Sequence, residues 1–140
     1  MNRFIQALLH GRALPRIIEP RTHEILDWLV TGYFLIVAGA TWGTHRRAAA
    51  TALINAGAVM GLTLMTDYDG DGSKPISFET HGKIDLVQAG MASGLPVLLG
   101  FASNAAALPF QAQAMNELVV VASTDWEAND GFSAEEDLAA

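Results

Sequence analysis

The sequence predicts an all-α fold, namely an integral membrane four-helix bundle made of two tandem helical hairpins behind a short N-terminal interfacial helix. Three observations predict this class. Of 140 residues, 51% are hydrophobic and only 16% are charged, which is an unusual balance for a soluble domain. An internal repeat has an offset of 58 residues. Four stretches also lack any Asp, Glu, Lys or Arg, so helices there have no charged outer face: residues 28–44, 48–66, 86–116 and 118–124.

The first predicted element lies in an N-terminal arm, residues 1–20. An amphipathic pattern predicts a short helix in the membrane interface, with Arg3 and Gln6 opposite an apolar face formed by Phe4, Ile5, Leu8 and Leu9. Pro15 and Pro20 then interrupt the chain before the first long apolar segment.

Two hairpins follow, because a spanning helix needs about 20 mostly apolar residues and the chain offers four such segments. The tight turn "THRR" joins the first two segments, and the loop "DYDGDGSKPISFE" separates the two hairpins. The predicted order is hairpin 21–68 with helices at about 22–43 and 48–66, polar loop 69–78, hairpin 79–126 with helices at about 81–102 and 105–124, and acidic tail 127–140.

The two hairpins form an internal repeat, since residues 21–68 align with residues 79–126 without a gap. The aromatic pair Tyr68/Trp126 closes the alignment at the level expected for a membrane interface. Both hairpins then enter the membrane from one side, and a pseudo-twofold axis runs along the membrane normal. The identical pairs are Thr22/Thr80, His23/His81, Asp27/Asp85, Gly32/Gly90, Ala48/Ala106, Ala49/Ala107, Ala56/Ala114, Thr66/Thr124 and Asp67/Asp125.

The second repeat, "THGKIDLVQAGMASGLPVLLGF", combines His-x-x-x-Asp, a Gly five residues on, and Pro-x-x-x-Gly-Phe. It resembles the SPW-repeat family of small bacterial membrane proteins with two-helix repeats, and the resemblance extends over residues 21–126. The Ser-Pro-Trp that names the family is "LPV" at residues 95–97 here and "AGA" at residues 38–40. The resemblance implies a tandem-hairpin architecture and no particular activity.

The distribution of basic residues predicts a multi-pass protein of the inner (cytoplasmic) membrane with both termini in the cytoplasm. Two basic residues, Arg46 and Arg47, lie in the first turn and none lie in the second. The side of the termini carries Arg3, Arg12, Arg16, Arg21, Lys74 and Lys83.

The repeated polar residues should meet at one membrane face, where both hairpins begin and end. The four-residue spacing of His23 to Asp27, and of His81 to Asp85, puts imidazole and carboxylate on one helical face. Three hypotheses follow: a helix-packing cluster with Thr22 and Thr80 as N-caps, a haem held by the two histidines, or a transition-metal or proton-relay site. The predicted metal ligands are His23, Asp27, Asp67, His81, Asp85 and Asp125.

Two further features bear on ligands. Glu117 interrupts the last apolar segment, and an ionisable group at membrane depth indicates either function or a buried pair with Asn55 or Gln88. The loop acids Asp67, Asp69 and Asp71 with Gly72 match the first half of a calcium-binding EF-hand loop. Its twelfth position is Phe78, so the second half does not match.

The favoured function is a structural or accessory membrane subunit that packs against itself, as a homo-oligomer, or within a larger membrane complex. The alternatives are a metal- or haem-binding membrane protein and an oligomeric proton or ion conductor that uses Glu117. A net charge of −7 argues against nucleic acid as a partner, since its phosphates require a basic surface and the eight Lys and Arg residues are scattered. The sequence contains no phosphate loop, nucleophile motif or Cys, so a non-enzymatic role is favoured.

Overall fold

The computed structural model describes residues 14–129, and the all-α prediction is confirmed within them. The interfacial helix and most of the acidic tail were predicted for residues that lie outside this range. The described elements are α2 (Pro20–Thr41), α3 (Arg46–Met65), β1 (Thr66–Asp67), β2 (Ile76–Ser77), α4 (Phe78–Leu98), the 3-10 helix η1 (Ala105–Ala107) and α5 (Leu108–Ser123).

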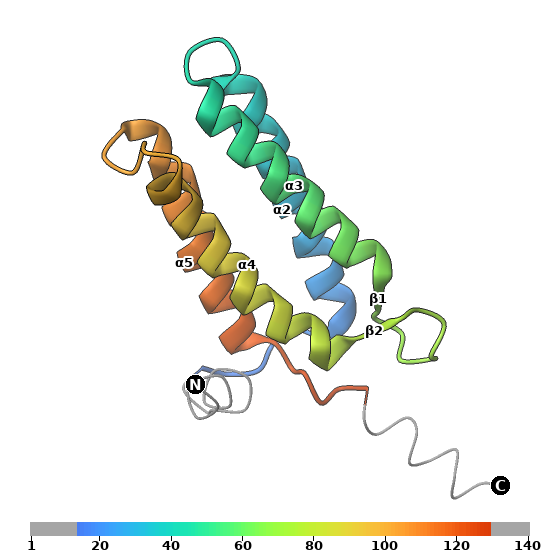
Figure 1. Cartoon of the computed structure of the whole chain (residues 1–140). Coiled ribbons are helices and arrows are strands. Elements are labelled where there is room, and N and C mark those ends of the chain that lie inside the picture. The colour runs from blue at the N-terminus through green and yellow to red at the C-terminus, as the bar shows by residue number, and fades with distance from the viewer. Residues whose placement is uncertain (1–13, 130–140) are drawn as a thin grey trace, which may run out of the picture.

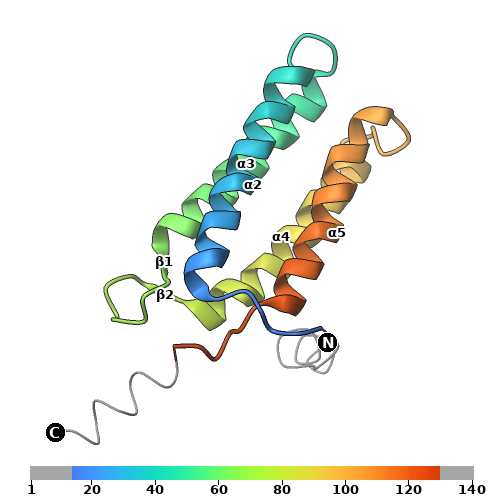
Figure 2. The same cartoon turned by 180° about the vertical axis from the view of Figure 1, so that it is seen from behind.

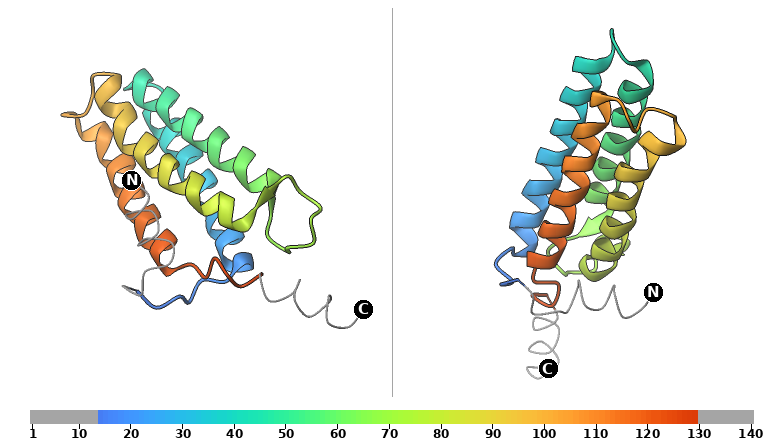
Figure 3. Two further views of the ribbon diagram at one scale, coloured as in Figure 1. Left: turned by 60° about the horizontal axis from the view of Figure 1, so that its bottom comes forward. Right: turned by 90° about the vertical axis from the view of Figure 1, so that its left-hand side faces the viewer.

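The helices associate mainly in sequence order. Helix α2 packs along α3, α4 packs along α5, and α3 also contacts α4. Figures 1 and 2 show the two pairs side by side, with both helix-connecting turns at one end and the β1–β2 loop at the other. The chain enters α2 and leaves α5 at the loop end, as the two views of Figure 3 also show. This end is called the base of the bundle below.

Element boundaries at the base follow the 58-residue offset. Helix α2 begins at Pro20 and α4 at Phe78, while α3 ends at Met65 and α5 at Ser123. The turns at the far end do not follow it, because α3 begins directly after its turn whereas η1 precedes α5. The two halves are therefore most alike at the base.

The backbone pairings at the base exchange partners between the halves. Strand β1 pairs in parallel with β2, with Thr66 opposite Ile76. An isolated parallel bridge joins Ile18 to Thr124. Ile18 and Ile76 occupy equivalent positions of the repeat, 58 residues apart, and so do Thr66 and Thr124. In each pairing, an isoleucine that precedes the first helix of one half lies opposite the threonine that follows the last helix of the other half.

The helix starts differ from the prediction. Thr22 and Thr80 are not N-caps, because α2 and α4 begin two residues before them, with Glu19 and Ser77 at the N-cap positions. The Ser77 side chain accepts a hydrogen bond from the Thr80 amide, whereas Glu19 makes no side-chain cap. Proline at the first position of α2 supplies the preset φ that favours an early start.

The ends of the second pair also differ. Helix α4 ends at Leu98 rather than at residue 102, and Gly100 then adopts a φ of +71°, a left-handed conformation that favours glycine. The segment predicted to begin a helix at residue 105 forms a 3-10 turn first, and the α-helical part starts at Leu108. Helix α5 therefore has 16 residues, which is about 24 Å at 1.5 Å per residue.

The interior is polar along much of its length. The far half of the core is aromatic and small, with Phe34, Phe101 and Phe110 against alanines. Hydrogen-bonding side chains are buried from Thr51, nearer the far end, through the middle of the bundle to the base: His23, Asp27, Thr31, Thr51, Asn55, Thr63, Thr66, His81, Asp85, Gln88, Gln113, Glu117 and Thr124.

The exterior is apolar. Ile36 is 73% exposed and Leu98 80% exposed, and each helix carries further residues of this kind on its outer face. They include Ile25, Leu29, Leu35, Leu53, Ile54, Leu64, Val87, Val97, Met115 and Val119. Within residues 14–129, two helices are long and apolar enough to cross a membrane, namely α2 and α3. The sequence predicted four spanning segments, and α4 and α5 do not meet this criterion by themselves.

Candidate functional site

Helix α2 carries His23 in its first turn, fully buried at the base. Its Nδ1 lies 2.9 Å from the hydroxyl oxygen of Thr124, the residue that ends α5. The Thr124 hydroxyl donates its proton to the Val120 carbonyl at 2.7 Å, so its oxygen accepts from the imidazole. This contact places a proton of His23 on Nδ1 and turns Nε2 toward the interior, where it lies within hydrogen-bond distance, 3.1 Å, of Oδ2 of Asp85.

The second half repeats this arrangement with the partners exchanged. His81 of α4 is 1% exposed, and its Nδ1 lies 2.8 Å from the hydroxyl oxygen of Thr66 at the end of α3. Thr66 donates to the Leu62 carbonyl at 2.7 Å, so it also accepts from the imidazole. Each histidine is therefore oriented by the threonine that ends the other half.

Two carboxylates meet the inward-facing Nε2 atoms, and each lies one turn after its histidine. Asp85 places its Oδ2 at 3.1 Å from Nε2 of His23 and 3.2 Å from Nε2 of His81. Asp27 places Oδ1 at 3.5 Å from Nε2 of His23 and Oδ2 at 3.2 Å from Nε2 of His81. Both carboxylates are buried, with 4% or less of either residue exposed. These four residues are called the His/Asp cluster below.

The surrounding shell keeps water from the His/Asp cluster and adds one hydrogen bond. Tyr68 donates its hydroxyl proton to Oδ2 of Asp27 at 2.6 Å. Burial, followed by the charge of Asp27, raises the pKa of Tyr68 above its ordinary value, so the phenol remains a donor. Trp126 packs its ring 5.0 Å from that of His23, and Phe78 packs 5.5 Å from it.

Gly82 allows Trp126 to approach. A Cβ at position 82 would lie 2.9 Å from three carbon atoms of the Trp126 ring, which is closer than real Cβ contacts. The indole nitrogen of Trp126 donates to the Val121 carbonyl at 3.0 Å, which fixes the ring against α4. Tyr68 and Trp126 are the aromatic pair of the repeat, but only Tyr68 reaches a carboxylate.

The His/Asp cluster has two chemically reasonable charge states. With both imidazoles neutral, the two carboxylates leave a charge of −2 in a buried site, which a divalent cation would balance. With both imidazoles protonated, the group is neutral and forms an ion-paired packing unit. Either state satisfies the rule that buried charges are paired or bind metal.

Two of the six predicted metal ligands lie elsewhere. Asp67 accepts hydrogen bonds from the amides of Gly70 at 3.0 Å and Gly72 at 2.6 Å, so its carboxylate organises the loop. Asp125 is half-buried and accepts from the Glu127 amide at 3.3 Å. Each directly follows a threonine of the site in extended backbone, where successive side chains point in opposite directions.

The calcium and haem hypotheses do not fit this geometry. In the loop, both Asp67 and Asp71 accept backbone amides, so their oxygens are directed at the chain itself rather than around a shared centre. Between the two histidines, the carboxylates of Asp27 and Asp85 occupy the space beside Nε2 that a haem plane would need.

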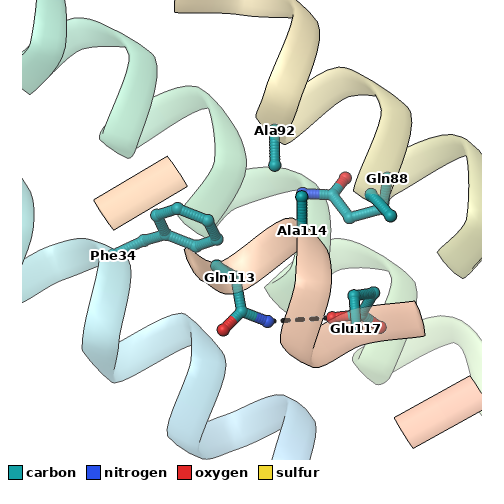
Figure 4. A pocket seen from close by; sticks show the side chains of 7 residues that line it. Phe34, Gln88, Ala92, Gln113, Ala114 and Glu117 are labelled. Carbon is teal, nitrogen blue, oxygen red and sulfur yellow. Dashed lines mark hydrogen bonds between the residues drawn. The ribbon is translucent and has the colours of Figure 1, made fainter. Parts of the chain in front are cut away.

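Glu117 is buried in the middle of the bundle, 6% exposed, but its predicted partners are not its hydrogen-bond partners. It accepts from the Gln113 side chain at 2.9 Å, while Gln88 donates to Asn55 at 2.9 Å. Figure 4 shows Glu117 and Gln113 joined in this way beside Gln88 and Phe34. The narrow space that these residues line does not admit a water molecule.

Three functional positions were not assigned as ligands or supports from the sequence. Thr66 and Thr124 were expected at the same membrane face, but their role in orienting the histidines was not. Tyr68 was interpreted as an interfacial aromatic residue.

Comparison with protein-family models, curated proteins and solved structures finds no match.

Proposed function

We propose that the protein is a small multi-pass protein of the cell inner membrane, built as a bundle of two tandem helical hairpins, and that it serves as a structural or accessory subunit. One observation carries this proposal, which is the distribution of polar and apolar side chains. Ile36, Leu29 and Val87 point outward, while Asn55, Gln88 and Glu117 point inward. A soluble bundle would have the opposite arrangement.

Helix dimensions support the proposal. Helices α2 and α3 extend for about 33 Å and 30 Å at 1.5 Å per residue, comparable with the hydrocarbon core of about 30 Å. Helix α5 alone is shorter, and η1 extends it toward the far end. The charged side chains on the outer surface of the helices lie near the helix ends, as in the pair of Arg21 with Glu24 and that of Lys83 with Glu79.

The far turn has interfacial chemistry. The Arg46 guanidinium lies 4.6 Å from the centre of the Trp42 ring, and Arg47 donates to the Leu99 carbonyl at 3.1 Å, which connects the two far turns. Tryptophan and arginine at a helix end are typical of a membrane–water boundary.

The outer surface of α3 supports the proposal of an accessory role. Gly57 and Gly61 lie one turn apart, and an added Cβ would meet no atom within 4 Å at either position. This small-xxx-small pattern therefore faces outward, where a helix of a second copy or of a larger complex could approach closely.

Cysteine accessibility tests the topology without background, because the sequence contains no Cys. We expect the full chain to stay in the membrane pellet after alkaline washing. Thr44→Cys in the far turn should react with a membrane-impermeant maleimide from outside the cell, and Ser73→Cys in the loop only after permeabilisation. A protein that is soluble without detergent, or two cysteines that react from the same side, would contradict the proposal.

Glu117 favours a second candidate, an oligomeric proton conductor. A buried carboxyl group in the middle of a spanning bundle is a typical feature of proton pathways. The space beside it is too small for water in this state, so conduction would require opening of the bundle. Proton flux into liposomes that is lost on Glu117→Gln would favour this function over the accessory role.

A further inference from the structure

The base of the bundle contains a buried polar atom whose environment needs explanation. Nε2 of His81 is completely buried and makes no hydrogen bond. Oδ2 of Asp27 and Oδ2 of Asp85 both lie 3.2 Å from it, yet neither is in the direction in which an Nε2–H would point. Two carboxylates at this distance, without hydrogen-bond geometry, surround the nitrogen in the manner of ligands that share a centre.

We propose that the His/Asp cluster binds one divalent first-row transition-metal ion, with Nε2 of His23, Nε2 of His81 and the carboxylates of Asp27 and Asp85 as ligands. Imidazole and carboxylate donors suit zinc, iron or manganese, and the absence of Cys excludes a thiolate site. The inference concerns these four residues and does not depend on whether the helices cross a membrane.

The distances agree with metal coordination. A tetrahedral ion with bonds of 2.0–2.1 Å holds neighbouring ligand atoms about 3.3 Å apart. The four nitrogen–oxygen distances of the cluster are 3.1, 3.2, 3.2 and 3.5 Å. They involve Oδ2 of Asp85 and both oxygens of Asp27. One ligand atom each from His23, Asp27 and His81 can be chosen so that all three lie within 4.8 Å of one another; Asp85 is outside this set and approaches the two Nε2 atoms, so it would move toward Asp27 as the fourth ligand.

The surrounding hydrogen bonds are those that a metal site requires. A histidine that binds metal through Nε2 normally donates its Nδ1–H to a fixed acceptor, which orients the ring. Thr124 and Thr66 supply these acceptors for His23 and His81, and Tyr68 holds the Asp27 carboxylate from outside. Both imidazoles can then be neutral, with their Nε2 lone pairs directed at the cluster.

The chemistry of the site points to a structural role for the ion. All four ligands come from the protein and are nearly inaccessible to solvent, which is the closed arrangement of structural sites. His23 and Asp27 belong to the first half of the chain, and His81 and Asp85 to the second. The ion would therefore join the two hairpins at the base.

Metal loading of the full chain tests the proposal. The protein is purified in mild detergent without a metal-affinity tag, stripped with chelator, and dialysed against Zn²⁺ or Co²⁺. We expect about one equivalent of metal per chain by elemental analysis, and for Co²⁺ the intense visible absorption of a four-coordinate ion. Asp85→Asn and His81→Gln should lower the affinity at least tenfold, whereas His45→Asn, which removes a histidine at the far end, should not change it.

The outcomes distinguish a metal-binding site from an ion-paired cluster that holds no metal. Folded wild-type protein, judged by its helical circular dichroism, that binds less than a tenth of an equivalent of Zn²⁺, Co²⁺, Fe²⁺ and Mn²⁺ would overturn the proposal and leave the ion-paired state of the cluster. Binding that survives both cluster substitutions would also overturn it. If the variants do not fold, the wild-type stoichiometry and the Co²⁺ spectrum decide. A soluble protein that binds metal would refute the membrane proposal and support this one.

Discussion

The Nδ1 atom of His23 lies 2.9 Å from the hydroxyl oxygen of Thr124, which is 101 residues further along the chain. The same contact joins His81 to Thr66 at 2.8 Å. Each half of the repeat thus orients the histidine of the other. Duplication of the Thr, His and Asp positions has a structural reason, because the base of the bundle is completed only when both halves contribute.

Removal of one threonine hydroxyl should therefore destabilise the bundle. Thr124→Val leaves the buried Nδ1–H of His23 without an acceptor, which costs about 1–3 kcal/mol. Unfolding monitored by circular dichroism in a fixed detergent measures this loss. Thr124→Ser should retain most of the stability, and Thr51→Val, which removes a buried hydroxyl that donates to the Arg47 carbonyl, is the matched control. Equal stability of Thr124→Val and wild type would refute the assigned contact.

Tyr68 should contribute more than an ordinary buried phenol. Tyr68→Phe removes a hydrogen bond to a buried carboxylate, for which a loss of about 1.5–3 kcal/mol is expected. Tyr33→Phe removes a neutral bond to the Pro109 carbonyl at 2.9 Å and should cost about 0.5–1.5 kcal/mol. Chemical denaturation of both variants compares the two losses, and the reverse order would show that Tyr68 does not support Asp27.

Glycine substitutions in α4 should have opposite effects. Gly82→Ala forces a methyl group against the Trp126 ring and should destabilise by about 1–3 kcal/mol. Gly90→Ala meets open space and should stabilise the helix by about 0.4–1 kcal/mol. Melting temperatures of the two single variants provide the measurement. A tolerated Gly82→Ala would mean that Trp126 packs elsewhere.

The outer apolar face should be sensitive to charge if it contacts lipid. Leu29 is 63% exposed near the middle of α2, and Leu29→Lys places an ammonium group there, which costs about 2.5–3.5 kcal/mol of insertion free energy. We expect the washed membrane pellet to contain less of this variant than of the control Thr44→Lys, whose lysine lies in the far turn. A soluble bundle would show the contrary result, with Leu29→Lys folded and more soluble than wild type.

Metal binding should distinguish the two predicted ligands that lie outside the His/Asp cluster from an aspartate that belongs to it. Asp67→Asn and Asp125→Asn should keep the metal content of wild type, because these side chains bind backbone amides of the loop and tail. Asp27→Asn should lose it. Elemental analysis after identical loading of the three variants tests this assignment, which fails if Asp125→Asn releases the ion.

The sequence predicted the helical class and the pairing of His23 with Asp27 and of His81 with Asp85, because four-residue spacing determines which side chains share a helical face. It could not predict that His23 contacts Thr124 and Asp85 in the other half, since these contacts depend on how the helices pack. The prediction that Asp67 joins the cluster was wrong for a local reason. Extended backbone at Thr66 turns the next side chain away.

The membrane environment was predicted from charge-free segments, and the structure bears on it in two ways. Helices α2 and α3 are long and apolar enough to cross a membrane, whereas α4 carries Glu79 and Lys83 in its first two turns, and α5 is short. Hydropathy cannot show that the polar residues of α4 and α5 face inward, because that depends on tertiary packing. The resemblance to the SPW-repeat family remains a prediction.

X-ray absorption of the zinc-loaded protein tests the central claim most directly, because it reports the atoms around the ion. The geometry predicts nitrogen and oxygen neighbours at about 2.0–2.1 Å, with the outer-shell scattering of two imidazoles, and loss of this spectrum in Asp85→Asn. A shell of water-like oxygens without imidazole scattering, or an identical spectrum for Asp85→Asn, would contradict binding at the His/Asp cluster.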